Sequence, residues 1–253
     1  MNPLGYIITK ARIWYLIRFA NRMCKQHNIT FSYKLNLRDA DVLNDIFFKR
    51  VYATAFPFYQ NCTIVDIGAH KGYFSLFASM YTGENAKIYS IEPEPSNYSA
   101  VCENVKHNKL TKISTFQCAI AGKTGKQQLY LSDTVNHSLV KVNSYHPYVK
   151  QSESIEVDTY SLKDFMNQNS ISEIEFMKMD CEGGEYDILF NTDNETFCRI
   201  KTIALEFHDL MNPEKNLYTL SKFLYAKGYK HMSTEFQDTP MPLNMGTITL
   251  TRN

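Results

Sequence analysis

The chain of 253 residues lacks the features that mark several common classes of protein. Its formal net charge is only +1, so no global electrostatic attraction to nucleic acid exists. Its six cysteines form no C-x-x-C pair and meet no histidine at metal-ligand spacing, which argues against a zinc knuckle. No stretch approaches the roughly 20 apolar residues of a membrane span. Arginines interrupt the apolar residues of the N-terminal stretch, and no small-residue cleavage site follows. We therefore expect a soluble, cytoplasmic protein without a signal peptide.

The chain also lacks the G-x-G-x-x-G fingerprint of dinucleotide-binding proteins. A short β-branched strand runs instead into a Gly68-x-x-x-Gly72 turn, with His70 where a pyrophosphate would need a second glycine. Asp66, just before the turn, puts negative charge where a phosphate would approach, and this suits a cationic ligand. Glu92 ends the next strand, where a carboxylate can hold the hydroxyls of a ribose. A bare G-x-x-x-G turn also occurs where a helix merely packs on a strand. With both acids present, the pattern favours S-adenosylmethionine, which carries a sulfonium and an ammonium but no phosphate.

The length suits one large α/β domain at 61–253, preceded by an accessory segment at 1–60. The accessory segment holds nine lysines and arginines against three acidic residues. Its first helix, expected at 4–26, either docks on the catalytic domain or presents a basic surface to an anionic lipid or a glycan. The many aromatic residues of this segment also allow a homodimer contact.

Two further elements are expected in the accessory segment. Residues 31–37 alternate between apolar and polar side chains, as an edge strand does. Asp39 or Asp41 could then cap a helix that continues through Val51.

Strands and helices alternate from Thr63 onward, which predicts a parallel sheet. The expected strands are 63–67, 87–92, 113–119, 174–180 and 202–208, with an extra strand at 126–131 and a closing antiparallel pair at 229–236 and 246–250. The expected helices are 71–81, 96–107, 161–168, 183–190 and 214–227. Residues 133–157 fit no helix and are rich in polar and aromatic side chains, which is typical of a lid over a site.

Charged side chains gather where two neighbouring strands end. Lys178 and Asp180 share one face of their strand, and Glu206 and His208 share one face of theirs. Ligands of open α/β sheets bind beyond the carboxyl ends of the strands, where these groups fall. Lys178 is anomalous inside a central strand, and a buried lysine needs a partner such as Asp180 or Glu206. The cluster is either an ion-pair network that orders the sheet edge or a catalytic rim.

The motifs together resemble the FkbM family of S-adenosylmethionine-dependent methyltransferases. The matching blocks are 65–76, 91–95, 118–122, 157–162, 177–185 and 206–208, within a likeness that runs from about residue 31 to 208. The K-x-D-x-E-G-x-E block at 178–185 is its most specific part. The resemblance implies a class I methyltransferase fold: a Rossmann-like, seven-stranded, mostly parallel sheet with helices on both faces, here with an N-terminal helical and edge-strand extension.

The resemblance also implies cofactor and catalytic residues. The expected cofactor-binding set is Asp66, Gly68, Ala69, His70, Gly72, Tyr73, Glu92, Pro93, Cys118 and Ala119. The expected catalytic set is His208, Asp180, Lys178, Glu206 and Glu182. For Glu182 alone, capping of a helix dipole is an equal alternative. The implied reaction is O-methylation of a sugar, a glycan or a related small molecule. The alternatives are a polyketide, lipid-linked or nucleic-acid acceptor, or a protein that binds the cofactor without catalysis.

Methyl transfer to an alcohol needs positioning and a base. His208 is the first candidate for the base, since a histidine titrates near neutral pH, and Lys178 is the second, with its pKa lowered by burial. Asp180 would orient the base or bind the acceptor hydroxyl. No metal is expected, and a divalent ion held by Asp180, Glu206 and His208 is the alternative.

Overall fold

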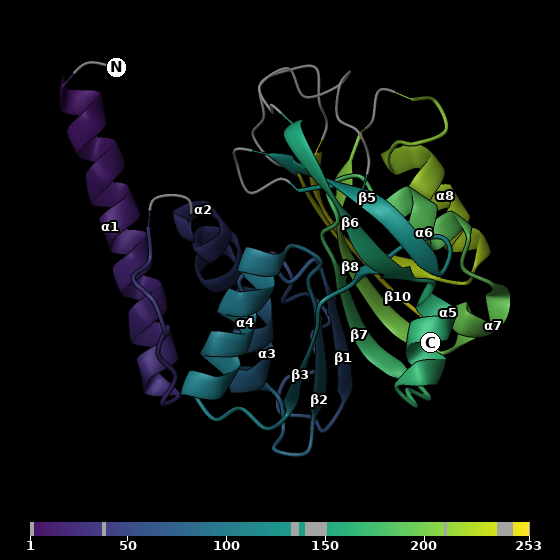
Figure 1. Cartoon of the computed structure of the whole chain (residues 1–253), viewed down its shortest axis with the longest axis horizontal. Coiled ribbons are helices and arrows are strands. Elements are labelled where there is room, and N and C mark those ends of the chain that lie inside the picture. Colours follow the sequence, from purple (N-terminus) through teal and green to yellow (C-terminus); the bar gives the residue numbers. More distant parts are fainter. Residues whose placement is uncertain are drawn as a thin grey trace.

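The computed structural model describes residues 3–36, 39–132, 137–139, 151–209, 212–236 and 245–252. Its centre is a seven-stranded sheet with the order β3-β2-β1-β7-β8-β10-β9 (Figure 1). The strands are β1 (Thr63–Ile67), β2 (Lys87–Ile91), β3 (Ile113–Phe116), β7 (Ile174–Met179), β8 (Ile200–His208), β9 (Lys230–Phe236) and β10 (Met245–Thr251). β10 pairs antiparallel with both of its neighbours, and the first five strands of this order are parallel.

Helices cover both faces of this sheet, which explains why its central strands are apolar on both sides. Figure 1 shows α3 (Tyr73–Tyr81) and α4 (Pro95–His107) on one side with the N-terminal helices. The other side carries α5 (Leu162–Gln168), α6 (Glu185–Phe190), α7 (Asn194–Cys198) and α8 (Leu217–Ala226). Along β1 the two faces alternate: Val65 and Ile67 join the core beneath α5 to α8, whereas Ile64 joins the core beneath α3. The seven-stranded sheet and its two helical layers confirm the expected class I fold.

The N-terminal segment differs from the expectation in one element. α1 (Pro3–Gln26) confirms the first helix, and α2 (Asp39–Leu43) continues as a π-helix, η1 (Asn44–Lys49), before Arg50 turns left-handed. The edge strand expected at 31–37 is wrong for residues 31–36, which form no strand, while residue 37 lies outside the described part.

Two asparagines, Asn104 of α4 and Asn108 directly after this helix, explain the missing edge strand. Asn108 bonds both the N–H and the carbonyl of Thr30, and Asn104 accepts from the N–H of Ser32. These amides satisfy the backbone that a neighbouring strand would otherwise pair with.

A second, three-stranded sheet has the order β4-β6-β5. It contains β4 (Ala119–Ile120), β5 (Gly125–Ser132) and β6 (Gln151–Tyr160). The strand expected at 113–119 is therefore divided between β3 and β4. The lid expected at 133–157 is wrong for its last part, because residues 151–157 belong to β6 and pair with β5. Most of the rest of that stretch lies outside the described residues.

The accessory segment shares a hydrophobic core with the sheet. Ala20 and Cys24 of α1 and Phe47 of η1 belong to the same buried cluster as Ile64 of β1 and Phe77 of α3. No helix among the described residues is long and apolar enough to cross a membrane.

Candidate active site

A cavity of about 240 Å³ lies beyond the carboxyl ends of β1, β2, β7 and β8. The strand order reverses between β1 and β7, and open α/β sheets bind their ligands at this switch point. The cavity is lined mainly by the loop after β1, the strand ends, the three-stranded sheet and the N-terminal segment.

The loop after β1 approaches the neighbouring backbone closely at Gly68. Its φ of +73° is left-handed, and a Cβ added here would lie 1.9 Å from the carbonyl oxygen of Asp180. The N–H groups of Gly68 and Ala69 donate to the carbonyl of Ile91, which fixes this loop against the end of β2. His70 follows, also left-handed with a φ of 51°, and lines the cavity. Only a glycine fits the first position of this loop.

Glu92 stands at the end of β2 and is only 5% exposed. One carboxylate oxygen accepts from the N–H of His70 at 2.7 Å, and the other accepts from the N–H of Glu94 at 3.0 Å. Burial raises the pKa of Glu92 to about 8, against the opposing effect of these two bonds. Each oxygen still has a lone pair for a ligand hydroxyl. The carboxylate is therefore oriented in advance as an acceptor.

Pro93, Cys118 and Ala119 line the cavity beside Glu92. Burial raises the pKa of the Cys118 thiol to about 12, so this group behaves as a small apolar side chain. Together with Ile120 these residues form an apolar wall.

Three residues of the expected cofactor set do not line this cavity: Asp66, Gly72 and Tyr73. The Tyr73 hydroxyl donates to Asp39 at 2.6 Å and accepts from Tyr33 at 2.9 Å, behind the loop. Asp66 is fully buried and accepts from the Ser75 hydroxyl at 2.7 Å. Its charge faces Lys178, with 3.4 Å between Asp66 Oδ1 and Lys178 Nζ.

Lys178 connects the loop to the acidic cluster. It is 3% exposed, and its ammonium donates to the Gly68 carbonyl at 2.7 Å. It also lies 3.6 Å from Asp180 Oδ2. Burial opposes the charge, but the carboxylates of Asp180 and Asp66 outweigh it and raise the pKa of the ammonium. The expectation of a lowered Lys178 pKa is wrong, because the two carboxylates stabilise the charge by more than burial destabilises it.

Asp180 and Glu206 form a pair of carboxyl groups on the cavity wall. Burial tends to raise the pKa of Asp180, but Lys178 and His208 hold it below its ordinary value. Burial and the neighbouring Asp180 carboxylate raise the pKa of Glu206 well above its ordinary value. The pKa values of the two carboxyl groups are therefore driven apart, so that Glu206 keeps its proton to a higher pH than Asp180 does.

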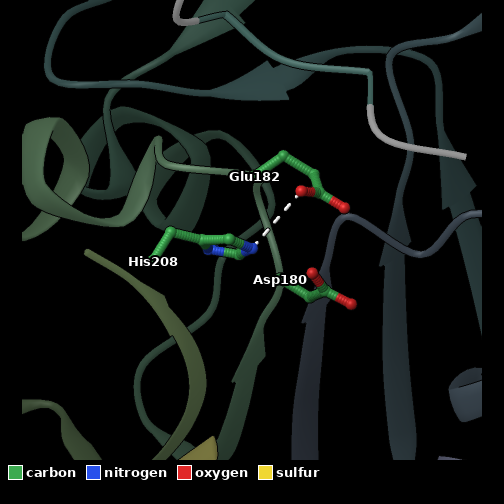
Figure 2. A group of neighbouring side chains, drawn as sticks. All are labelled: Asp180, Glu182 and His208. Atoms are coloured by element: carbon green, nitrogen blue, oxygen red, sulfur yellow. Dashed lines mark ion pairs between the residues drawn. The ribbon is translucent and has the colours of Figure 1, made fainter. Parts of the chain in front are cut away.

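His208, the last residue of β8, lies between two acidic side chains. Its Nε2 is 3.3 Å from Glu182 Oε2 and its Nδ1 is 3.4 Å from Glu185 Oε1. Figure 2 shows the ring and the Glu182 carboxylate pointing toward one another, with Asp180 beside them. Burial opposes the charge, but Glu185 and Glu182 raise the pKa of His208 well above its ordinary value. The imidazole is thus held protonated, rather than tuned toward neutral pH as expected.

Sequence reasoning missed the side of the cavity that the N-terminal segment builds. Asp41, Asp45 and Tyr52 form this side of the cavity. Met245 and Thr247 of β10, which also line the cavity, were missed as well. A signal was present for the two acids, because they are four residues apart and therefore share one helical face. For the β10 residues no motif was available, since their position depends on antiparallel pairing with β8.

Comparison with known proteins gives a consistent family. A family model described as the methyltransferase FkbM domain matches residues 66–238. A protein of Beauveria bassiana named Methyltransferase 1 is 26% identical over 226 residues, which cover 83% of this chain and 88% of the relative. The 31-O-demethyl-FK506 methyltransferase FkbM of Streptomyces tacrolimicus is 23% identical over 177 residues, covering 58% of this chain and 65% of that protein. Among solved structures, methyltransferase FkbM from Methylobacillus flagellatus has a TM-score of 0.49 at 14% identity, covering 90% of this chain and 58% of that one.

Proposed function

Because the chain belongs to the FkbM family of methyltransferases, we propose that it methylates a hydroxyl of a sugar, a glycan or a related small molecule. The observation that carries the proposal is the cavity, in which two backbone N–H groups orient the carboxyl group of Glu92 and an acidic cluster around Asp180 forms one wall.

S-adenosylmethionine is the methyl donor of this family, and its sulfonium supplies an activated methyl group. The residues at the β1 and β2 ends fit it. Glu92 would accept from the ribose hydroxyls, and Cys118 and Ala119 would lie against the adenine. The loop from Gly68 to His70 would surround the methionine part. Asp66, Gly72 and Tyr73 would support this loop without contacting the cofactor, since they do not line the cavity.

The charges around the cavity favour a neutral, hydroxyl-rich acceptor. Six acidic residues line it: Asp41, Asp45, Glu92, Asp180, Glu182 and Glu206. Carboxylates repel phosphate groups, so a nucleic acid or a phosphorylated lipid is disfavoured. The same carboxylates accept hydrogen bonds from alcohols, and Tyr52 and Phe74 add aromatic surface for a sugar or another small ring.

The acidic cluster would receive the acceptor. Asp180, kept ionised by Lys178 and His208, would accept a hydrogen bond from the hydroxyl and orient its oxygen. The hydroxyl proton would pass to the carboxyl groups of the cluster as the new carbon–oxygen bond forms. His208 would act through Asp180 and Glu182, since its own ring is already protonated.

Replacing His208 by alanine is expected to lower turnover by about 100-fold, because the charge beside Asp180 is lost. The affinity for S-adenosylhomocysteine, measured by calorimetry, should not change. His231→Ala, which alters an exposed histidine on β9, is the matched control and should leave turnover unchanged. Equal turnover in the two variants would show that His208 does not contribute to methyl transfer.

The acceptor class is tested with S-adenosylmethionine labelled in its methyl group. We expect label on free sugars or glycosides, and mass spectrometry should show the added methyl on oxygen. Label on a polyketide, a lipid-linked sugar or tRNA instead would overturn the proposed acceptor. Binding of S-adenosylhomocysteine without transfer to any acceptor would favour a non-catalytic cofactor-binding protein. Absence of binding would refute the enzymatic function altogether.

Replacing Glu92 by glutamine is expected to weaken S-adenosylhomocysteine binding about 10- to 100-fold, because the amide keeps only one of the two acceptor oxygens. Calorimetric titration measures the change. Glu103→Gln removes an exposed carboxylate on α4 and serves as the control. A Glu92 variant that binds as tightly as this control would show that the ribose lies elsewhere.

Cellular location and assembly remain predictions. We expect the protein to act in the cytoplasm as a soluble enzyme. The exposed Trp14 and Tyr15 of α1, 62% and 53% accessible, suit either a peripheral membrane contact or a homodimer.

A further inference from the structure

Three ligand atoms converge at the acidic end of the cavity. One atom from each of Asp180, Glu182 and His208 lies within 4.8 Å of the others, and Figure 2 shows the three side chains facing a common space. Asp180 follows β7, Glu182 sits in the turn before α6, and His208 ends β8. The sheet register and the turn therefore bring together residues that come from separate segments.

The histidine of this group is buried without a hydrogen bond. The whole residue is 4% exposed, and neither ring nitrogen has a hydrogen-bond partner within the described part of the chain. Its two nearest acceptors, on Glu182 and Glu185, lie at 3.3 and 3.4 Å, longer than a charge-assisted bond of about 2.7–2.9 Å. A buried imidazole that makes no good hydrogen bond calls for another partner.

We propose that Asp180, Glu182 and His208 bind a divalent cation through two carboxylate oxygens and His208 Nε2, which releases its proton to solvent when the cation binds. The donor set of one nitrogen and two oxygens suits Mn²⁺, Fe²⁺, Zn²⁺ or Mg²⁺, and Mn²⁺ is the representative used below. The structure corrects the alternative drawn from the sequence in one ligand, because Glu182 takes the place of Glu206.

Glu185 has the position of a residue that orients the histidine. It is fully buried, and its Oε1 accepts from the N–H of Cys181 at 2.8 Å while it faces His208 Nδ1. Histidine ligands of metals commonly present their second nitrogen to a carboxylate in this manner, which fixes the ring and leaves Nε2 for the metal. The Tyr186 hydroxyl donates to the His208 carbonyl at 2.9 Å and holds the backbone of the same residue.

The cation would lie at the cavity, since Asp180 and Glu182 both line it. Three protein ligands leave coordination positions for water or for an oxygen of the acceptor. On the assumption that the proposed methyl transfer is correct, the cation would orient the acceptor hydroxyl and make it more acidic.

The test uses the full chain, freed of metal with a chelator and titrated with Mn²⁺. Calorimetry and electron paramagnetic resonance should reveal one bound Mn²⁺ per chain, and electron spin-echo spectra of the wild type should contain modulation from a histidine nitrogen. His208→Ala, Asp180→Asn and Glu182→Gln should each weaken binding more than about 100-fold. Glu185→Gln should weaken it about 10- to 100-fold, as expected for a residue behind a ligand. The matched surface variants His231→Ala and Glu195→Gln should bind like the wild type.

The outcomes separate this site from the methyl-transfer function. Absence of bound Mn²⁺ at millimolar concentration, or binding without nitrogen modulation, would overturn the cation site. So would equal binding in the ligand variants and the surface variants. S-adenosylhomocysteine is titrated into the same preparations, so its binding in a protein that takes no Mn²⁺ would refute the cation and leave the enzyme proposal intact. The wild-type spectrum decides the question even if a ligand variant does not fold.

Discussion

Replacing Gly68 by alanine is expected to lower the free energy of unfolding by about 3 to 5 kcal/mol. The new Cβ would stand 1.9 Å from the carbonyl oxygen of Asp180, and the residue would also have to keep a φ of +73°. The neighbouring atom is backbone at the end of a central strand, so it cannot turn aside as a flexible side chain would. Relief of the clash must separate the loop from β7. Binding of S-adenosylhomocysteine should be lost together with stability.

The control variant Gly228→Ala separates the steric clash from the cost of the left-handed φ. Gly228 also has a left-handed φ, +89°, but an added Cβ would meet only the far end of the Arg252 side chain, at 3.7 Å or more. This control should lose only the conformational part, about 1 kcal/mol. Urea unfolding followed by circular dichroism measures both variants. Equal losses would mean that the approach of the loop to β7 does not require a glycine.

Replacing Lys178 by methionine is expected to lower the free energy of unfolding by about 3 to 5 kcal/mol at neutral pH, since it leaves buried carboxylates without their cation. Asp66 would lose the partner 3.4 Å away, and Asp180 would lose the one at 3.6 Å. The double variant Lys178→Met with Asp66→Asn should recover part of the loss, because it removes one of the stranded charges. Without such recovery, the loss would have to come from packing rather than from charge.

The loss of stability in the single variant Lys178→Met should also depend on pH, and the pKa of Asp66 determines the direction of this dependence. In the folded protein burial raises the pKa of Asp66, and loss of Lys178 removes the main effect that opposes this rise. A group with a raised folded-state pKa contributes stability that is present at low pH and lost as the pH increases through that pKa. The deficit of Lys178→Met relative to the wild type should therefore be smaller at pH 5 than at pH 8. Urea unfolding at the two values tests this, and a deficit that does not change with pH would contradict the charge explanation.

The sequence predicted the parallel strands well because their signals are local. The first strand was placed at the observed bounds, Thr63–Ile67, and the polar ends of β7 and β8 were expected to meet. That expectation needed only the period of a strand and the rule that parallel strands end at one edge. The site residues at these ends accordingly came from pattern alone.

Protonation states could not be predicted in the same way. A buried lysine has a lowered pKa in isolation, and the direction reverses only because Asp66 and Asp180 both approach it. Likewise, the pKa of His208 depends on Glu182 and Glu185, which reach it from a turn and a helix in another segment. Such shifts depend on distances between side chains far apart in the chain. The missing edge strand has the same origin, in the side-chain amides of Asn108 and Asn104, which are 78 and 72 residues from their partners Thr30 and Ser32.

The division of the cavity wall has a consequence for how relatives diverge. The loop, Glu92 and the acidic cluster all lie within residues 66–238, whereas Asp41, Asp45 and Tyr52 precede that region. One wall of the cavity is thus encoded outside the stretch that the family model matches. Exchange of residues 41–52 between homologues is expected to alter that wall while Glu92 and the acidic cluster are inherited unchanged.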